Sequence, residues 1–244
     1  MAEKQKSCIH IQNVIRKFGD NEVIHGISLD VHQNEILGLL GPSGSGKTTL
    51  VKMIAGIDEA TSGEIEVLGS RMPKLSMMNR IGYMAQSDAL YTELSAKENL
   101  EFFGSLFGLR SEKLKRRMQE VMELVMLTEH LKRSVGTFSG GMKRRLSLAI
   151  ALLHEPEILI LDEPTVGIDP VLRKSIWDEF NKLSKNGTTI LLTTHVMDEA
   201  DKCHRLGMVR DGRLIAAGTP EALKKETSSD TIEEAFLFYG GIRT

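Results

Sequence analysis

Two stretches of the sequence contain glycines in patterns that suit anion binding. The first, GPSGSGKT at residues 41–48, has the G-x-x-x-x-G-K-[ST] spacing, follows the apolar run EILGLL and precedes a helical pattern. In such a loop, backbone N–H groups close around phosphates, Lys47 meets the β- and γ-phosphates, and the Thr48 hydroxyl ligates Mg²⁺. The sequence therefore predicts nucleotide binding by Gly41, Pro42, Ser43, Gly44, Ser45, Gly46, Lys47, Thr48 and Thr49.

The second stretch, FSGGMKRRLSLAI at residues 138–150, reads as a turn that opens a basic, amphipathic helix. A helix N-terminus presents unpaired N–H groups and a favourable dipole to an anion. From these residues, a plain loop-to-helix cap is as good an interpretation as an anion site. The motif itself does not explain why a chain with one complete phosphate loop has a second such stretch.

Two carboxylates end a third motif, the apolar strand pattern ILILDE at residues 158–163. In a phosphate-loop fold this strand lies beside the loop. Asp162 can then hold Mg²⁺ through its water shell, and Glu163 can act as general base on the attacking water. The alternative is an acidic strand end that only caps the next turn.

Composition limits the classes of protein to which the chain can belong. Its 244 residues are 41% hydrophobic and 26% charged, which suits one globular domain with an insertion. A formal net charge of -2 excludes the global basic field of a broad nucleic-acid binder. The longest apolar runs are much shorter than the roughly 20 residues that span a bilayer, so a membrane role requires a partner. Cys8 and Cys203 are expected to be reduced thiols, which favours the cytoplasm.

Strand and helix patterns alternate along most of the chain, which is typical of a parallel sheet with crossover helices. We expect strands at 9–16, 22–31, 35–40, 63–69, 80–86, 157–163 and 188–194, and a hairpin at 205–218 that turns at Asp211-Gly212. We expect helices at 47–56, 96–109, 111–127, 169–186 and 196–203, and one or two short helices after Thr219. From about Ser95 to Leu131 the pattern is helical throughout, which indicates an inserted subdomain.

The motifs GPSGSGKT, FSGGM and LDEPTVGID, in this order and followed by TTH, resemble the ATP-binding subunit of an ABC transporter. The resemblance runs from about Ile9 to Gly218. It implies an α/β phosphate-loop NTPase core with a parallel sheet, an N-terminal antiparallel β subdomain and an inserted helical subdomain at about 88–155. The ATP-binding domain would span 1–226, with a short helical tail at 227–244.

The resemblance also implies roles for single residues. Gln86 would reach Mg²⁺ and the attacking water, and His195 would contact the γ-phosphate and orient Glu163. Asp169 lies in the loop that couples two subunits across their interface, and Phe18 takes the place of the aromatic residue that stacks on adenine. The plain alternatives are a solvent-facing glutamine, a structural histidine and a phenylalanine packed under the first hairpin.

In this family the Ser-Gly-Gly stretch binds the ATP held by a partner subunit. Ser139 and the N–H groups of Gly140 and Gly141 would meet the γ-phosphate of ATP on the other chain of a homodimer or heterodimer. The family commonly has LSGGQ; here Phe138 and Met142 replace Leu and Gln, and neither change removes a backbone donor. Two ATP molecules would close the dimer, and hydrolysis would weaken it.

Three segments resemble the sequences of exporters of drugs, antibiotics, lipids or polysaccharide, whose ATPase is a separate polypeptide: YTELSAKENLEFFGSLFG, FSGGMKRRLSLA and DEPTVGIDPVLR. This implies a transmembrane permease partner and a peripheral position on the cytoplasmic face of the membrane. The permease would contact the surface near Gln86 and residues 88–107. Several apolar residues there could form a groove or the subdomain's own core: Leu90, Tyr91, Leu94, Phe102 and Phe103.

Other functions fit the sequence less well. A soluble ABC-type ATPase that acts on nucleic acid or ribosomes would normally have two cassettes or a long coiled coil, and a kinase or GTPase would lack the Ser-Gly-Gly stretch. An importer ATPase is a further alternative, although importers commonly have Gln after the glycines. The basic run KLKRR at 113–117 alternates with apolar residues and reads as a solvated helix face, so no nucleic-acid partner is expected. The remaining histidines have no ligand spacing, and we assign them no metal.

Overall fold

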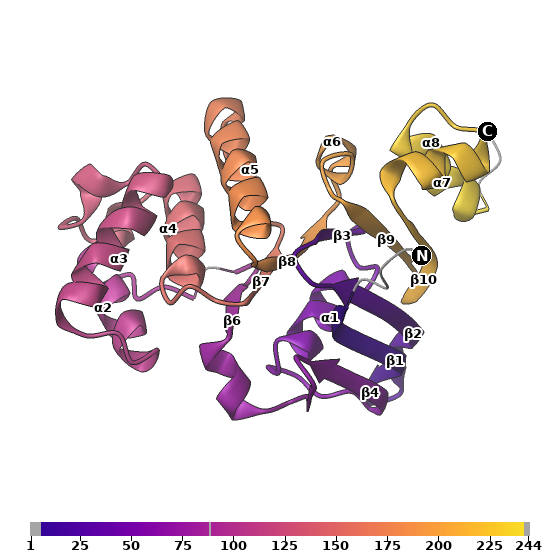
Figure 1. Cartoon of the computed structure of the whole chain (residues 1–244), viewed down its shortest axis with the longest axis horizontal. Helices are drawn as coiled ribbons and strands as arrows, with labels where there is room; N and C mark the ends of the chain where they lie inside the picture. Colours follow the sequence, from indigo (N-terminus) through magenta and orange to yellow (C-terminus); the bar gives the residue numbers. More distant parts are fainter. Residues whose placement is uncertain (1–5, 88, 242–244) are drawn as a thin grey trace. The chain divides into compact units, whose positions relative to one another are not determined.

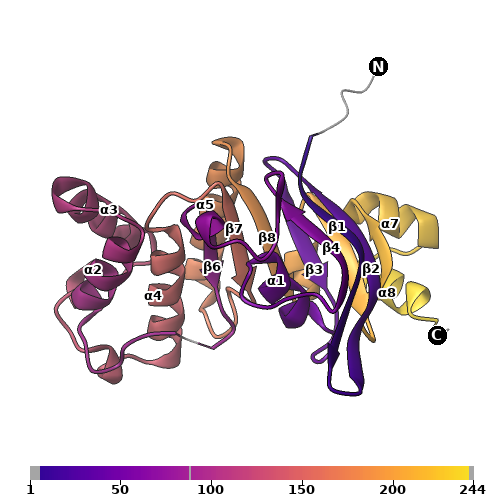
Figure 2. The same cartoon turned by 90° about the horizontal axis from the view of Figure 1, so that it is seen from below.

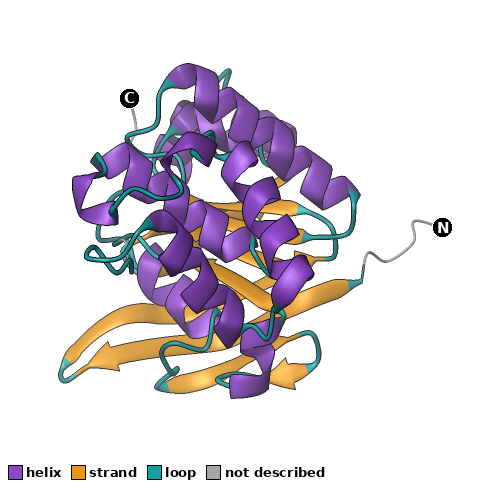
Figure 3. Ribbon diagram, turned by 90° about the vertical axis from the view of Figure 1, so that its left-hand side faces the viewer, coloured by secondary structure: helices purple, strands orange, loops and turns teal. Residues whose placement is uncertain are grey.

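The structure, a computed structural model, describes residues 6–87 and 89–241 and divides into two compact units. The first unit combines the chain up to Met78 with the chain from Thr189 onward, and the second unit runs from Asn79 to Thr188. Helices, drawn in purple in Figure 3, connect the strands of each unit.

An antiparallel sheet begins the first unit. It contains β1 (Ser7–Phe18), β2 (Asn21–His32), β4 (Ser62–Val67) and β5 (Ser70–Arg71) in the order β2-β1-β4-β5. The strands β1, β2 and β4 lie side by side in Figures 1 and 2. Apolar residues of β1 such as Ile9, Ile11 and Val14 are buried, as their alternation with polar residues predicts. The expected N-terminal antiparallel subdomain is therefore confirmed.

Parallel strands form the second sheet region of this unit. Here β3 (Ile36–Leu40) pairs in parallel with both β8 (Thr189–Thr194) and β9 (Arg205–Arg210), and β10 (Arg213–Gly218) pairs with β9 in antiparallel fashion. All residues of β3 and β8 are buried, which explains the apolar runs Ile36–Leu40 and Ile190–Leu192. The helices α1 (Lys47–Ile54) and α6 (Met197–Ala200) follow β3 and β8, as expected for crossover connections.

Two short helices end the described chain: α7 (Pro220–Thr227) and α8 (Ile232–Tyr239). Each begins at a threonine whose hydroxyl accepts a bond from a backbone N–H of the first turn. Arg210 Nη1 of β9 donates to Gly240 O at 2.7 Å and so holds the end of α8. The predicted short helices after Thr219 are confirmed.

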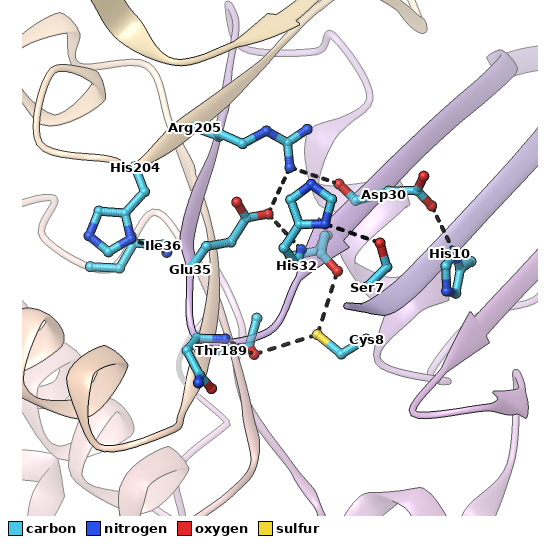
Figure 4. Close-up of polar contacts among 12 residues, drawn as sticks. Ser7, Cys8, His10, Asp30, His32, Glu35, Ile36, Thr189, His204 and Arg205 are labelled. Carbon is cyan, nitrogen blue, oxygen red and sulfur yellow. Dashed lines mark hydrogen bonds and ion pairs between the residues drawn. The ribbon is translucent and has the colours of Figure 1, made fainter. Parts of the chain in front are cut away.

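A polar network holds the antiparallel sheet against the parallel strands within the first unit (Figure 4). The Glu35 carboxylate is 5% exposed, and its Oε1 accepts bonds from Arg205 Nη1 at 2.9 Å and from His32 N at 2.7 Å. Cys8 Sγ lies 3.5 Å from Thr189 Oγ1, and burial raises the pKa of the Cys8 thiol. Both Cys8 and Cys203 are buried free thiols, as the sequence predicts.

The second unit has two parallel strands and a set of helices. β6 (Ile81–Met84) pairs with β7 (Ile158–Asp162). Its helices are α2 (Ala96–Leu106), α3 (Ser111–Leu124), α4 (Gly140–Leu152) and α5 (Pro170–Lys185), with 3₁₀ turns at Thr128–His130 and Val135–Thr137. A further 3₁₀ turn, Leu75–Asn79, precedes β6. Within the described ranges, no helix is both long enough and apolar enough to cross a membrane.

Side-chain caps explain where these helices begin. Ser95 and Glu98 form a reciprocal capping box at the start of α2, and Asp169 caps α5 ahead of Pro170. On α3, the basic run is paired: Arg116 and Arg117 both contact Glu120. Arg117 also donates to the carbonyls at the end of α4. Arg116 is exposed, as the interpretation of the run as a solvated helix face predicts, whereas the Arg117 side chain is only 14% exposed and packs against α4.

Candidate active site

The loop at residues 41–49 wraps around the ammonium group of its own lysine. Lys47 is 5% exposed, and its Nζ donates to Gly41 O at 2.8 Å and to Pro42 O at 2.9 Å. Gly46 precedes α1 with a φ of 98°, a conformation that glycine adopts without strain. A Cβ at Gly41 would lie 2.0 Å from Val209 O, so only glycine fits there. The loop thus has the compact backbone path that phosphate binding requires.

His195 leaves the same edge of the parallel strands as this loop. Leu40, the last residue of β3, lies opposite Thr194, the last residue of β8. Thr194 Oγ1 donates to Glu199 Oε2 at 2.8 Å and accepts from Val196 N at 3.0 Å, which fixes the turn that carries the exposed imidazole of His195. The structure therefore brings His195 and the phosphate loop together within the first unit.

In the second unit, parallel strand pairing likewise brings Gln86 close to the acidic pair Asp162 and Glu163. Met84 of β6 lies opposite Leu161 of β7, so Gln86 and Glu163 follow neighbouring carboxyl ends. Gln86 Nε2 lies 3.5 Å from Glu163 Oε2, and Asp162 is fully buried. These positions fit the predicted division of roles, because a buried carboxylate suits an ion and a partly exposed one can reach a water.

Oxygen donors of the kind that Mg²⁺ prefers occur in both units. Thr48 offers a hydroxyl in the first unit, and Asp162 and Gln86 offer a carboxylate and an amide oxygen in the second. Their chemistry fits the predicted magnesium ligands.

The Ser-Gly-Gly stretch forms the start of α4. Ser139 is the N-cap residue, and its Oγ accepts a bond from Met142 N at 3.2 Å. A hydroxyl that accepts in this way retains its proton for donation. Gly140 has open space where a side chain would be, whereas a Cβ at Gly141 would lie 3.1 Å from Gly167 O. The helix start is confirmed, and its exposed residues Ser139 and Gly140 are accessible to an anion.

Comparison with known proteins decides the family. The family described as "ABC transporter" matches residues 24–166. The chain is 42% identical over 240 residues to the linearmycin resistance ATP-binding protein LnrL of Bacillus subtilis, across 94% of this chain and 77% of that protein. The chain belongs to the ABC transporter family.

Further relatives are similar to this chain over most of its length. The chain is 41% identical over 229 residues to the Nod factor export ATP-binding protein I of Burkholderia lata, across 92% of this chain and 75% of that protein. It is 41% identical over 243 residues to the probable multidrug ABC transporter ATP-binding protein YbhF of Escherichia coli, across 95% of this chain. The chain spans 41% of the length of YbhF.

Among solved structures, an ATP-binding subunit of an ABC transporter matches with a TM-score of 0.89 and 26% identity, across 96% of this chain and 100% of that one. The cassette MJ0796, solved as a dimer bound to ADP and Pi, matches with a TM-score of 0.80 and 26% identity, across 86% of this chain and 98% of that one. These matches confirm the ABC ATPase fold.

Two predicted residues of the ABC cassette have structural contacts that the sequence did not specify. Phe18 is 49% exposed, and the Arg16 guanidinium carbon lies 4.3 Å from its ring centroid, so the ring is not packed under the first hairpin. Arg16 is itself held by two bonds to Asp58. Asp169 caps α5 by accepting bonds from two backbone N–H groups, whatever further role it has in the ABC cassette.

The apolar surface expected near Gln86 is partly a core of its own. The rings of Tyr91 and Phe102 lie 4.9 Å apart, and those of Phe102 and Phe103 lie 5.3 Å apart. Tyr91 is 43% exposed and Phe102 is 38% exposed, whereas Leu90, Leu94 and Phe103 are half-buried. Asp88, the first residue of this segment, lies outside the described residues.

Arg144 is a candidate functional residue of the ABC cassette that the sequence motifs do not reveal. The sequence of residues 138–150 predicts a basic, amphipathic helix and assigns Arg144 no role, but Arg144 is 7% exposed and contacts the backbone carbonyls of Gln86 and Glu163. The spacing between Arg144 and Leu148 was the sequence signal for this burial. Leu148 follows four residues later, lies on the same side of the helix and is fully buried.

Proposed function

We propose that this chain is the ATP-binding and hydrolysing subunit of an exporter-type ABC transporter and that it drives a separate transmembrane permease. The names of the relatives support the exporter branch: one is a linearmycin resistance ATP-binding protein, another is a Nod factor export ATP-binding protein, and a third is a probable multidrug ABC transporter ATP-binding protein. The observation that carries the enzymatic part is the position of Glu163, partly exposed and within 3.5 Å of the Gln86 amide, directly after the buried Asp162.

Phosphate binding is assigned to the first unit. The N–H groups of the loop at 41–49 and the Lys47 ammonium bind the β- and γ-phosphates, and the exposed ring of Phe18 stacks on adenine. Thr48 in the first unit, and Asp162 and Gln86 in the second, would offer oxygen ligands to Mg²⁺, which would neutralise charge on the phosphate oxygens.

Hydrolysis is assigned to Glu163 and His195. Glu163 accepts a proton from the attacking water, whose oxygen forms a bond to the γ-phosphorus while the bond to the β-phosphate oxygen breaks. His195 donates to the γ-phosphate and orients the carboxylate. Gln86 positions the same water through its amide.

Dimerisation completes the site. The start of α4, Ser139 to Gly141, binds the γ-phosphate of ATP on a second subunit, and Asp169 lies at the contact of the two subunits. The dimeric form in which MJ0796 was solved supports this arrangement. Two ATP molecules therefore hold the dimer closed until hydrolysis loosens it.

The permease contacts the aromatic surface formed by Tyr91 and Phe102, and this contact places the subunit on the cytoplasmic face of the membrane. The exposed fractions of both rings support a docking role beyond their packing on each other.

One pair of variants tests the enzymatic proposal. Glu163→Gln should bind ATP and form dimers, with kcat lowered by about a thousandfold because the base is removed. Glu112→Gln makes the same change on an exposed face of α3 and should keep normal kcat. Near-normal turnover of Glu163→Gln would remove Glu163 as the base.

Purification from detergent-solubilised membranes of the source cell tests the transport proposal. The tagged chain should be recovered with a multi-span membrane protein, and the double variant Tyr91→Ala/Phe102→Ala should lose it. Recovery with ribosomes or nucleic acid would support a soluble ABC-type ATPase instead, and a complex that takes substrate inward would support an importer.

A further inference from the structure

Arg144 forms a four-point contact with the backbone of the two catalytic loops. Its Nη1 donates to Ala85 O and to Gln86 O, both at 2.8 Å. Its Nη2 donates to Asp162 O and, at 2.6 Å, to Glu163 O. One buried side chain of α4 thus holds the peptide groups that carry Gln86, Asp162 and Glu163.

Only a guanidinium suits this position. Arginine has five N–H donors in a flat, fixed fork, so its two terminal nitrogens can each serve a different loop. A lysine ammonium is a single point charge, and it cannot span both carbonyl pairs. The four carbonyl dipoles compensate the charge of Arg144, which is 7% exposed.

The backbone of Glu163 needs such support. Its φ is 54°, a left-handed conformation that residues other than glycine rarely adopt. Residues in unusual backbone conformations persist where the surrounding structure fixes them, and they are often functional. The bond from Arg144 Nη2 fixes the carbonyl of Glu163, and with it the direction in which the side chain leaves the backbone.

We propose that Arg144 is a positioning residue that couples the start of α4 to the general base. Ser139 and Arg144 lie on the same helix, less than two turns apart, so α4 carries both as one body. When contact with the nucleotide of a partner subunit displaces the start of α4, Arg144 transmits this displacement to the peptide groups of Gln86 and Glu163. The proposal rests on the proposed function, because it takes Glu163 as the base and Ser139 as the phosphate contact.

Arg117 provides a matched control. Its guanidinium also donates to backbone carbonyls of α4, Leu152 O at 2.8 Å and Leu153 O at 3.1 Å, but these lie at the far end of the helix from the catalytic loops. Arg117→Met therefore removes a comparable helix contact without touching Gln86 or Glu163.

Kinetics of the purified chain form the first test. Arg144→Met should lower kcat by about a hundredfold with KM for ATP within about twofold of wild type, because misplaced catalytic groups slow chemistry more than binding. Arg144→Lys, which keeps the charge and most of the volume, should recover only part of the rate. Arg117→Met should lose thermal stability but keep kcat per folded molecule. Equal losses of kcat in Arg144→Met and Arg117→Met would overturn the proposal.

Amide hydrogen exchange of the nucleotide-free chain gives a readout that does not depend on activity. In Arg144→Lys, which is the variant more certain to fold, exchange should accelerate at residues 85–87 and 163–168 and stay unchanged in α3 and α8. Unchanged exchange at both catalytic segments would overturn the proposal.

A double-mutant cycle separates this inference from the proposed function. In Glu163→Gln the base is already gone, so adding Arg144→Met should reduce the residual kcat by about tenfold at most, which is the part that acts through Gln86. A further hundredfold loss would show that Arg144 acts independently of the base. If Glu163→Gln alone keeps normal turnover, the proposed function fails; if it fails to turn over but Arg144→Met is normal, only this inference fails.

Discussion

Gln86 Nε2 lies 3.5 Å from Glu163 Oε2, although the two residues are 77 positions apart in the sequence. The parallel pairing of β6 with β7 produces this contact, because both residues follow the carboxyl ends of neighbouring strands. An amide at this distance can orient a carboxylate without neutralising it, which leaves Glu163 able to accept a proton.

Gln86→Ala should therefore slow hydrolysis more than it weakens binding. We expect kcat to fall by about tenfold or more, with ATP affinity nearly unchanged, because in the proposed function the amide acts on the carboxylate and the water. Steady-state ATPase assays together with equilibrium ATP titration measure both quantities. Gln119→Ala makes the same change on α3, where the exposed Gln119 donates to Glu123 Oε1 at 2.9 Å, and should leave both unchanged. A large loss of ATP affinity in Gln86→Ala would contradict the orienting role.

Ser139→Ala tests whether the start of α4 acts on a partner's nucleotide. The change removes an N-cap, at a cost of about 1 kcal/mol, and also removes the hydroxyl donor. ATP binding to the monomer should be unchanged, whereas turnover and ATP-dependent dimerisation should fall. Thr219→Ala removes a comparable cap from α7 and should reduce stability by a similar amount with turnover retained. Weaker ATP binding by the Ser139→Ala monomer would place this residue on its own chain's nucleotide instead.

Local sequence signals predicted those parts of the fold and site that depend on short stretches. The spacing of Gly41 to Thr48 predicted a loop between strand and helix, and the loop has that form. The cap at Ser139 was likewise visible in the sequence, since serine followed by glycines precedes a helical pattern. In these cases the backbone requirement is satisfied by residues that lie next to each other.

Features that depend on tertiary packing were not visible. Arg144 reads as a surface residue because arginine seldom lies in a core, and the four carbonyls that compensate its buried charge are brought to it by other segments. The Arg16 contact with Phe18 depends on Asp58, which is distant in the sequence and holds the guanidinium in place. The left-handed backbone of Glu163 could not be foreseen either, because Glu followed by Pro favours extended conformations.

The buried Glu35 should make the first unit sensitive to Arg205. In Arg205→Met, the carboxylate keeps the bond from His32 N but loses its countercharge, and we expect unfolding free energy to fall by about 3 kcal/mol. Urea denaturation monitored by circular dichroism measures this loss. Lys182→Met breaks an exposed pair with Glu179 and should cost no more than about 0.5 kcal/mol. Equal stabilities of the two variants would show that the Glu35 pair contributes nothing beyond a surface contact.

His154 should make stability depend on pH. Its ring stacks on Phe107 with centroids 3.8 Å apart, Nε2 donates to Ile81 O at 3.2 Å, and burial lowers its pKa to about 4 from 6.5. Between these two pH values the unfolded chain binds a proton that the folded chain does not, so stability falls as pH falls through this window. Protonation of His154 leaves the free energy of unfolding nearly unchanged above pH 6.5 and lowers it by up to about 2 kcal/mol by about pH 5.

His154→Phe should remove this slope while keeping the ring contact with Phe107. Urea unfolding of both proteins between pH 7 and about pH 4.5 measures the difference, because other titrating groups contribute equally to the two curves. The variant should lose less stability than wild type as the pH falls, although at pH 7 it loses the hydrogen bond to Ile81 O. Parallel stability curves for the two proteins would mean that the imidazole takes up its proton without leaving the folded structure.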